Sequence, residues 1–397
     1  MSQSLKSVTE KERIISLDIM RGFAILGIFL VNMLTFHSPF MYIDPLEYWS
    51  GAVDQSIYTF LDLFVQASFY PLFALLFGYG LMIMRERSLL KGYSFGQIAT
   101  RRLSLLLFIG MIHAFLIWHG DILITYALMG FLFLLFMRLN GKNLIIIGIV
   151  LYVIPNLLMV LLVFASLFIV SGDALSLTDP AQVEASFQAY QNGSFTEITV
   201  QRFKDWYFAN NLGTFFVMII SILPLFLIGG GVAKLKWLEE PKKHQRKLII
   251  IASTALIIGL LLKLLPMFTA HNFATNYVQD AFGGPLLAIG YGLVIALIIE
   301  NETMKKLLYP LSFVGKLSLS NYLLQSIVAT FIFYQYGLGL YGKVSLATGT
   351  VIVLIIYIMQ LLISRYWVKH FYYGPVEWVW RSFTYLQYPQ WKRKNHE

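Results

Sequence analysis

The run LIIIGIVLYVIPNLLMVLLVFASLFIV, at residues 144–170, contains no charged side chain. A helix needs about 20 apolar residues to cross the hydrocarbon core of a bilayer, so this run is long enough to span a membrane. Comparable apolar runs recur on both sides of it. Together they predict ten spans, at residues 14–34, 56–84, 103–119, 122–137, 144–170, 211–233, 248–265, 282–300, 312–334 and 345–367.

These runs predict an all-α fold, a polytopic transmembrane bundle of about ten helices. The composition agrees, since 58% of the residues are apolar and only 13% are charged, against about 25% charged in soluble domains. The chain has no Cys, which excludes disulfides, thiolate metal sites and a Cys nucleophile. Neither a Walker A loop nor a zinc-type H-E-x-x-H spacing occurs, and we expect no metal cofactor.

The third and fourth spans, 103–119 and 122–137, are short and are separated only around Gly120 and Asp121. They predict either a tight helical hairpin or one re-entrant pair. The sixth span contains Pro224 and the run Gly229–Gly231, which predict a broken or kinked helix that packs closely on its neighbours.

The Lys and Arg side chains predict the orientation. With the N-terminus in the cytoplasm, most of them fall in cytoplasmic segments, and the outer side keeps only Arg202, Lys204, Lys263 and Lys343. Cytoplasmic loops carry such an excess of positive charge, so both ends are expected inside. The net charge of +9 therefore predicts that the basic loops bind the anionic lipid surface rather than nucleic acid.

This topology divides the chain into a cytoplasmic tail at 1–13, a bundle at 14–367 and a cytoplasmic interfacial segment at 368–397. The longest outer connection lies at about 171–210. Within it, 181–207 predicts an amphipathic helix on the outer surface. Its lipid-facing side chains would be Phe187, Tyr190, Phe195, Phe203, Trp206 and Tyr207.

Ionisable groups inside spans are the first candidates for function, because each costs about 2.5–3.5 kcal/mol on insertion scales. Asp18 and Arg21 lie three residues apart and share a helix face with room for a neighbour at Gly22; Asn32 lies further along the same span. We interpret these residues as an anion clamp in which Arg21 holds a phosphate or carboxylate. An internal salt bridge is the alternative.

His113 and Asp121 form the second candidate. A His and a carboxylate that meet can act as a base and the group that orients it. In the alternative, His113 bonds to a neighbouring backbone, while Asp121 and His119 are solvated at the outer interface.

His37 and Asp54 flank the outer segment 35–55 and form a third, looser pair of catalytic candidates. Their separation does not follow from the sequence. An ordinary surface loop is the alternative.

Asn321 and Gln325 lie four residues apart in the ninth span, so they share a face and are candidate substrate-binding residues. Hydrogen bonding between helices is the alternative. After the last span, Pro375 suits the start of a short amphipathic helix. In it Glu377 and Arg381 would form an i,i+4 pair, either as substrate-binding residues or within a membrane anchor.

Several motifs resemble the YeiB-like bacterial membrane proteins, a family of unknown function, over almost the whole chain. They are RIISLDIMRGFAILGI at 13–28, GDIL at 120–123 with upstream His113, GKLSLSNYLLQS at 315–326, GLGLYG at 337–342 and GPVEWVWR at 374–381.

The opening LDIMRG at 17–22 is also similar to a wider superfamily of transmembrane acyltransferases, which includes heparan-α-glucosaminide N-acetyltransferase. This resemblance implies a helical bundle that carries acyl groups across the membrane from cytosolic acyl-CoA. It also implies a working His in the outer half, for which His37 and His113 are both candidates.

We therefore expect a membrane acyltransferase in the bacterial cytoplasmic membrane. Arg21, aided by Arg101 and Arg102, would hold the acyl-CoA phosphates, and His113 would deprotonate a small-molecule, glycan or lipid acceptor at the outer face. The polar ninth span and the broken sixth span favour a small-solute transporter or exporter instead. A non-enzymatic membrane subunit is the third hypothesis. A second copy of the chain, in a homo-oligomer, is a further candidate partner.

Overall fold

A computed structural model describes residues 13–168, 178–269 and 272–393. Parts of four predicted segments lie outside these ranges: most of the N-terminal tail, the end of the 144–170 span, the first part of the 171–210 connection and the last four residues of the chain.

The helices are α1 (Ile15–His37), α2 (Pro45–Tyr48), α3 (Ala52–Phe64), α4 (Phe69–Leu90), α5 (Phe95–Ile112), α6 (Leu123–Leu134), α7 (Gly141–Ser166), α8 (Pro180–Phe187), α9 (Phe195–Asn210), α10 (Leu212–Lys234), α11 (Gln245–Lys263), α12 (Leu265–Phe268), α13 (Phe273–Val278), α14 (Gly284–Ile298), α15 (Glu302–Lys316), α16 (Ser318–Phe333), α17 (Leu346–His370) and α18 (Pro375–Tyr385). Short 3-10 turns lie at Phe40–Tyr42 and Pro241–His244, and π-helical turns at His113–Ile117, Gln188–Asn192 and Gln279–Gly283. The described residues contain no β-strand, only an isolated bridge between Phe371 and Lys392.

The all-α polytopic bundle is confirmed. In the described ranges, 8 helical stretches are long and apolar enough to cross a membrane: Ile15–His37, Ala52–Leu90, Phe95–Ile117, Gly141–Ser166, Leu212–Lys234, Pro241–Lys263, Phe273–Ile298 and Leu346–His370. The apolar helices α6 and α16 are shorter. Since α6 has 12 residues, it rises about 18 Å, less than the roughly 30 Å hydrocarbon core. Of the two predicted spans 103–119 and 122–137, only the first is long enough to cross the membrane.

Helices α1 and α15 cross with their backbones in contact. A Cβ added at Gly22 would lie 2.0 Å from the Leu311 carbonyl oxygen, and one added at Gly315 would lie 1.8 Å from the Asp18 carbonyl oxygen. The predicted room for a neighbour at Gly22 is therefore confirmed, and the neighbour is α15. This crossing holds the start of α16 beside α1.

The predicted break in the sixth span is wrong, because α10 runs through Pro224 without interruption. Its glycines serve close packing, as expected. A Cβ at Gly229 would lie 2.0 Å from the Leu75 carbonyl oxygen of α4, and one at Gly231 would lie 2.7 Å from the Gly141 carbonyl oxygen of α7.

Two other predicted spans are interrupted. The 56–84 span divides into α3 and α4, and Ala67 in the connection has a φ of 55°. The 312–334 span divides at Leu317, where α15 ends and α16 begins. Polar residues mark both breaks, with Gln66 and Ser68 beside Ala67 and with Lys316 and Ser318 beside Leu317.

The predicted outer helix at 181–207 is also divided, into α8, a π-helical turn and α9. Phe195, Phe203 and Tyr207 are exposed as expected, but Tyr190 is 1% exposed. The polar face of α9 packs on the bundle, since Arg202 and Asp205 are buried.

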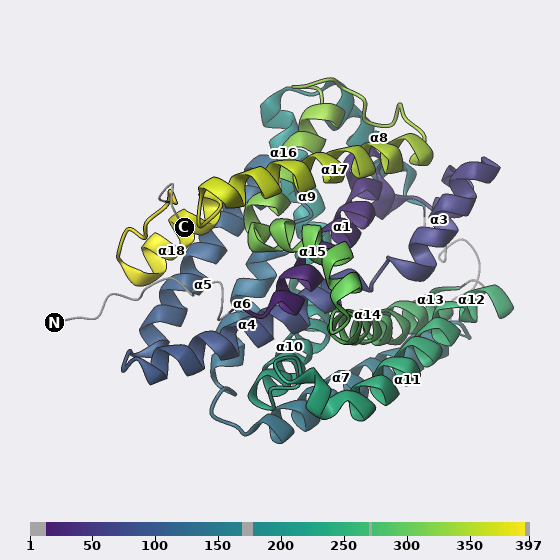
Figure 1. Cartoon of the computed structure of the whole chain (residues 1–397). Coiled ribbons are helices and arrows are strands. Elements are labelled where there is room, and N and C mark those ends of the chain that lie inside the picture. The colour runs from purple at the N-terminus through teal and green to yellow at the C-terminus, as the bar shows by residue number, and fades with distance from the viewer. Residues whose placement is uncertain (1–12, 169–177, 270–271, 394–397) are drawn as a thin grey trace.

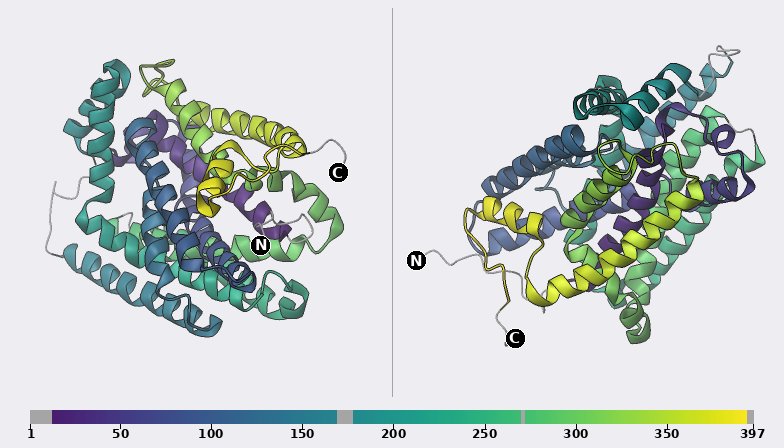
Figure 2. Two further views of the ribbon diagram at one scale, coloured as in Figure 1. Left: turned by 90° about the vertical axis from the view of Figure 1, so that its left-hand side faces the viewer. Right: turned by 90° about the horizontal axis from the view of Figure 1, so that it is seen from above.

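The amphipathic C-terminal helix is confirmed as α18. It lies at one end of the bundle and α3 lies at the opposite end, both in Figure 1 and in the view from above in Figure 2. By the predicted orientation, α18 marks the cytoplasmic end and α3 the outer end.

We predict that Gly315→Ala destabilises the bundle, because its methyl group collides with the α1 backbone. Overpacking of this kind costs about 1–3 kcal/mol. Thermal unfolding of the purified protein in detergent measures the loss. Gly96→Ala is the matched control, since an added Cβ there meets nothing within 4 Å. Equal melting temperatures for both variants would contradict the assigned crossing.

Candidate functional site

His113 lies between a carboxylate and a hydroxyl inside the bundle. Its Nδ1 is 2.8 Å from Asp121 Oδ1, and its Nε2 is 2.8 Å from Ser326 Oγ. The side chains of His113 and Asp121 are both fully buried. The predicted meeting of His113 with Asp121 is confirmed, whereas the alternatives of a backbone partner and a solvated Asp121 are wrong.

The local backbone explains this arrangement. Helix α5 ends in the π-helical turn His113–Ile117, a distortion that often occurs at functional sites. The chain then turns, and Asp121 Oδ2 accepts a hydrogen bond of 2.8 Å from the Ile124 N–H at the start of α6. Gly110 gives the turn space, since a Cβ there would lie 2.7 Å from the Ile124 nitrogen.

The hydrogen bonds define what each group does. A carboxylate only accepts, so His113 Nδ1 donates to Asp121. In the neutral ring, Nε2 is then the acceptor and the Ser326 hydroxyl donates to it. Asp121 is held in place by its second bond to α6. The arrangement can therefore take up a proton at Nε2 and hold the resulting imidazolium beside a carboxylate.

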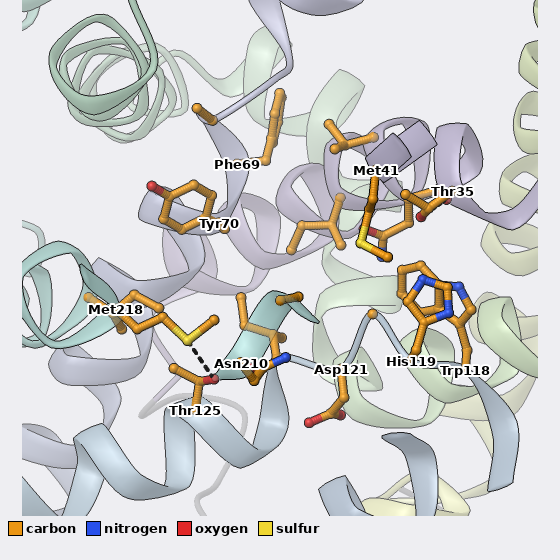
Figure 3. Close-up of a pocket in the computed structure, with 18 of the residues that line it drawn as sticks. Thr35, Met41, Phe69, Tyr70, Trp118, His119, Asp121, Thr125, Asn210 and Met218 are labelled. Carbon is orange, nitrogen blue, oxygen red and sulfur yellow. Dashed lines mark hydrogen bonds between the residues drawn. The ribbon is translucent and has the colours of Figure 1, made fainter. Parts of the chain in front are cut away.

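A cavity of about 430 Å³ lies next to this group. Figure 3 shows Phe69 and Tyr70 on one side and Trp118 and His119 on another. The wall includes Val65 and Ala67 from the break between α3 and α4. Irregular backbone at membrane depth is tolerated where it lines a cavity, which explains why this span is broken here.

The cavity wall is mainly apolar, with a few polar groups. The polar wall residues include Asn32, Thr35, His119, Asp121, Thr125, Asn210 and Ser221. The Asp121 carboxylate points away from the cavity in Figure 3. His113 and Arg21 are not wall residues.

Tyr322 separates the cavity from His113. It is a wall residue, its ring centroid is 5.1 Å from that of His113, and its hydroxyl donates to the Gly120 carbonyl at 3.3 Å. Asp121 and Trp118 are further wall residues next to His113, so three side chains lie between the cavity and the buried ring.

Helix α9 is pinned against the cavity by buried polar groups. Asp205 accepts hydrogen bonds from Tyr42 at 2.9 Å, Gln201 at 2.7 Å and Tyr190 at 2.6 Å. Arg202 donates to the Leu116 carbonyl at 3.0 Å. Because α9 also contributes cavity residues, these bonds position one wall of the cavity.

His119 joins this pin to the cavity wall. Its side chain is buried rather than solvated as expected. Its Nδ1 lies 3.3 Å from the Tyr190 hydroxyl and 3.7 Å from Asp205 Oδ2.

Asp18 and Arg21 pair as predicted, with Arg21 Nη1 donating to Asp18 Oδ1 at 3.1 Å. Arg13 Nε lies 4.0 Å from the same carboxylate. The salt bridge expected as the alternative is thus present, and 28% of the Arg21 side chain remains exposed. Asn32, on the same helix, lines the cavity instead.

His37 and Asp54 do not form a hydrogen-bonded pair. Neither ring nitrogen of the buried His37 has a partner, and its ring packs near Trp49 and Phe333. Asp54 Oδ1 accepts from the Ala347 N–H at the start of α17. The predicted catalytic pairing of these two residues is therefore absent from the structure.

Asn321 and Gln325 bond α16 to α17, which is the alternative expected for them. Gln325 Nε2 donates to Gln360 Oε1 at 2.8 Å, and Gln360 Nε2 donates to the Asn321 carbonyl at 2.9 Å. Asn321 Nδ2 donates to Ser364 Oγ at 3.1 Å. Their side chains are already satisfied by the protein.

The predicted ion pair between Glu377 and Arg381 is wrong. Glu377 Oε1 accepts from the Leu319 and Ser320 N–H groups at 2.8 and 3.0 Å, and Oε2 accepts from the Ser320 hydroxyl. The first N–H groups of a helix lack internal partners and attract a carboxylate, so the start of α16 outcompetes Arg381. Burial nevertheless raises the pKa of Glu377, against the opposing effect of these bonds.

Among the described residues, no three or more His, Asp and Glu side chains gather as a metal site would require. Sequence reasoning missed Ser326 as the partner of His113, and Arg202 and Asp205 as buried groups. Ser326 stands in the quoted GKLSLSNYLLQS motif, which was the available signal.

The fold and the site define a multi-pass α-helical membrane protein with a buried acid–base group beside an internal cavity. The chain belongs to the YeiB-like family. Residues 232–387 match the family described as "Protein of unknown function (DUF418)". The chain is 36% identical to "Uncharacterized protein YxaH" of Bacillus subtilis (strain 168), over 97% of both chains.

Two further bacterial relatives match over most of their length. "Uncharacterized protein YeiB" of Escherichia coli (strain K12) is 30% identical, over 94% of this chain and 96% of the relative. The "Uncharacterized 39.9 kDa protein in amylase 3'region" of Bacillus acidopullulyticus is 29% identical, over 94% of both. The predicted YeiB-like membership is confirmed.

We predict that Asp205→Ala loosens α9, because it leaves the Tyr42, Gln201 and Tyr190 donors without their acceptor. Each buried unsatisfied group costs about 1–3 kcal/mol. Hydrogen exchange should accelerate across α9 and the π-helical turn before it. Asp179→Ala removes an exposed cap from α8 and should leave the exchange of α9 unchanged. Unaltered α9 exchange in Asp205→Ala would show that the pin is dispensable.

Proposed function

We propose that this protein is an acyltransferase of the bacterial cytoplasmic membrane, which moves an acyl group from cytosolic acyl-CoA to an acceptor at the outer face. The observation that carries the proposal is the buried His113 between Asp121 and Ser326. A bundle needs no such group for packing, and an intramembrane ionisable residue is a functional candidate by default. The acceptor would be a small molecule, a glycan or a lipid headgroup.

In this mechanism His113 Nε2 is the base. The acceptor hydroxyl or amine takes the place of the Ser326 hydroxyl and gives its proton to Nε2 as it attacks the thioester carbonyl. The new ester or amide bond forms, the carbon–sulfur bond breaks, and the imidazolium protonates the departing CoA thiolate. Asp121 orients the ring and stabilises its charged form. The cavity holds the acceptor once the Tyr322 side chain moves aside.

The donor enters from the opposite end. Arg21 lies at the cytoplasmic side of α1, and Asn32 lies in the cavity eleven residues further along the helix, a rise of about 16 Å. In bound acyl-CoA, the arm that carries the thioester has to span this distance, from the phosphate groups held by Arg21 to the cavity.

The transporter alternative was based on a broken sixth span and a polar ninth span. The first of these observations no longer favours it, because α10 is continuous. The polar groups of α16 that were its other support are bonded to α17. The acyltransferase proposal is therefore the better supported of the two.

We predict that purified protein releases CoA from acyl-CoA and that His113→Ala and Asp121→Asn lower the rate by about 10²-fold or more. A thiol reagent measures the release, and the chain itself adds no signal because it has no Cys. His37→Ala is the matched control and should keep its activity, since His37 contacts neither the cavity nor His113.

Size-exclusion profiles of the variants verify that each is folded. Undiminished CoA release by folded His113→Ala would refute His113 as the base. Absence of release by the wild type with a panel of acceptors and acyl chains would refute the activity.

A further inference from the structure

Two arginine side chains near the predicted cytoplasmic end, Arg102 and Arg381, form no ion pair with a described residue. Arg102 of α5 lies within electrostatic reach of Arg21 of α1 and Arg381 of α18. Arg21 is paired with Asp18.

Aromatic rings hold both guanidinium groups by their faces. The Arg102 guanidinium lies 3.5 Å from the centroid of the Trp380 ring, and that of Arg381 lies 4.7 Å from the Tyr373 ring. Trp380 also donates to the Arg102 carbonyl at 2.8 Å, which fixes α18 on α5. Stacking occupies the faces of a guanidinium and leaves its N–H edge for a planar or tetrahedral anion.

Two buried polar atoms at this place lack partners. Arg381 Nε and the hydroxyl of Tyr373, which is 7% exposed, make no hydrogen bond. The nearest candidate to neutralise Arg381 is Glu377, but its carboxylate is committed to the start of α16. Buried donors are ordinarily satisfied, so the Arg381 Nε–H and the Tyr373 hydroxyl are groups that an external anion can bind.

We propose that Arg102 and Arg381, together with Arg21 and the Tyr373 hydroxyl, form a binding site for a phosphate-bearing anion at the cytoplasmic end. Arginine forks match phosphate oxygens with paired charge-assisted hydrogen bonds. The phosphates of CoA and those of anionic lipid headgroups share this chemistry. The site adds a donor-binding region to the proposed acyltransferase. Only the assignment of acyl-CoA as the bound anion rests on that proposed function.

Binding of coenzyme A and of inorganic pyrophosphate to full-length protein in phosphatidylcholine nanodiscs tests the site without any turnover. Arg102→Gln and Arg381→Gln should each weaken binding by about tenfold or more, as expected when a charge-assisted hydrogen bond is lost. Arg246→Gln removes the same charge from an exposed position of α11 and should stay within about twofold. Tyr373→Phe, which removes only the hydroxyl, should weaken binding and preserve the fold.

A second arm identifies the source of the phosphate. If phosphatidylglycerol in the nanodisc competes with coenzyme A in the wild type but not in Arg102→Gln, the site takes lipid headgroups; if it does not compete, the site takes the soluble anion. Equal losses in Arg246→Gln and Arg102→Gln, or no binding of either probe and no lipid effect, would overturn the proposal. Failure of the acyltransferase proposal is separate, because it shows as absent CoA release with anion binding intact.

Discussion

A polar group inside a bilayer has to find its partner within the protein, because the hydrocarbon offers none. The fold is organised by this constraint at each depth. At the predicted cytoplasmic end, Glu377 accepts hydrogen bonds from the first N–H groups of α16. In the middle, Gln325 donates to Gln360, and Gln360 donates to the Asn321 carbonyl. Toward the predicted outer end, Asp205 accepts hydrogen bonds from three other side chains. Helix α16 takes part at two of these depths and also supplies the hydroxyl that meets His113.

Some polar side chains are not needed to bond one helix to another, and these side chains are the evidence for a function. His113 and Asp121 would cost less as apolar residues, since burying an ion pair is seldom a gain in stability. Arg102 and Arg381 have aromatic neighbours but form no ion pair with a described residue. One such group lies beside a cavity in the predicted outer half, and the other lies at the predicted cytoplasmic end. A protein that uses both has to connect the two faces of the membrane.

Local sequence signals predicted much of this arrangement, and tertiary contacts decided the rest. His113 and Asp121 are eight residues apart on either side of a turn, so their meeting could be foreseen. Ser326 is 213 residues away from His113, and no local rule connects them. Glu377 and Arg381 followed the i,i+4 rule in prediction, but unsatisfied N–H groups of another helix attracted the carboxylate. The break at Ala67 is flanked by Gln66 and Ser68, but it lacks the Gly or Asn that usually marks a positive φ.

The placement of the two sites on opposite faces is the central claim. It is tested most directly by labelling single cysteines in a chain that has none. Asn210→Cys lies in the cavity wall, and Gly96→Cys lies at the exposed start of α5. A membrane-impermeant maleimide should label Asn210→Cys in right-side-out vesicles and Gly96→Cys only in inverted vesicles. Labelling of both cysteines from the same side would contradict the account.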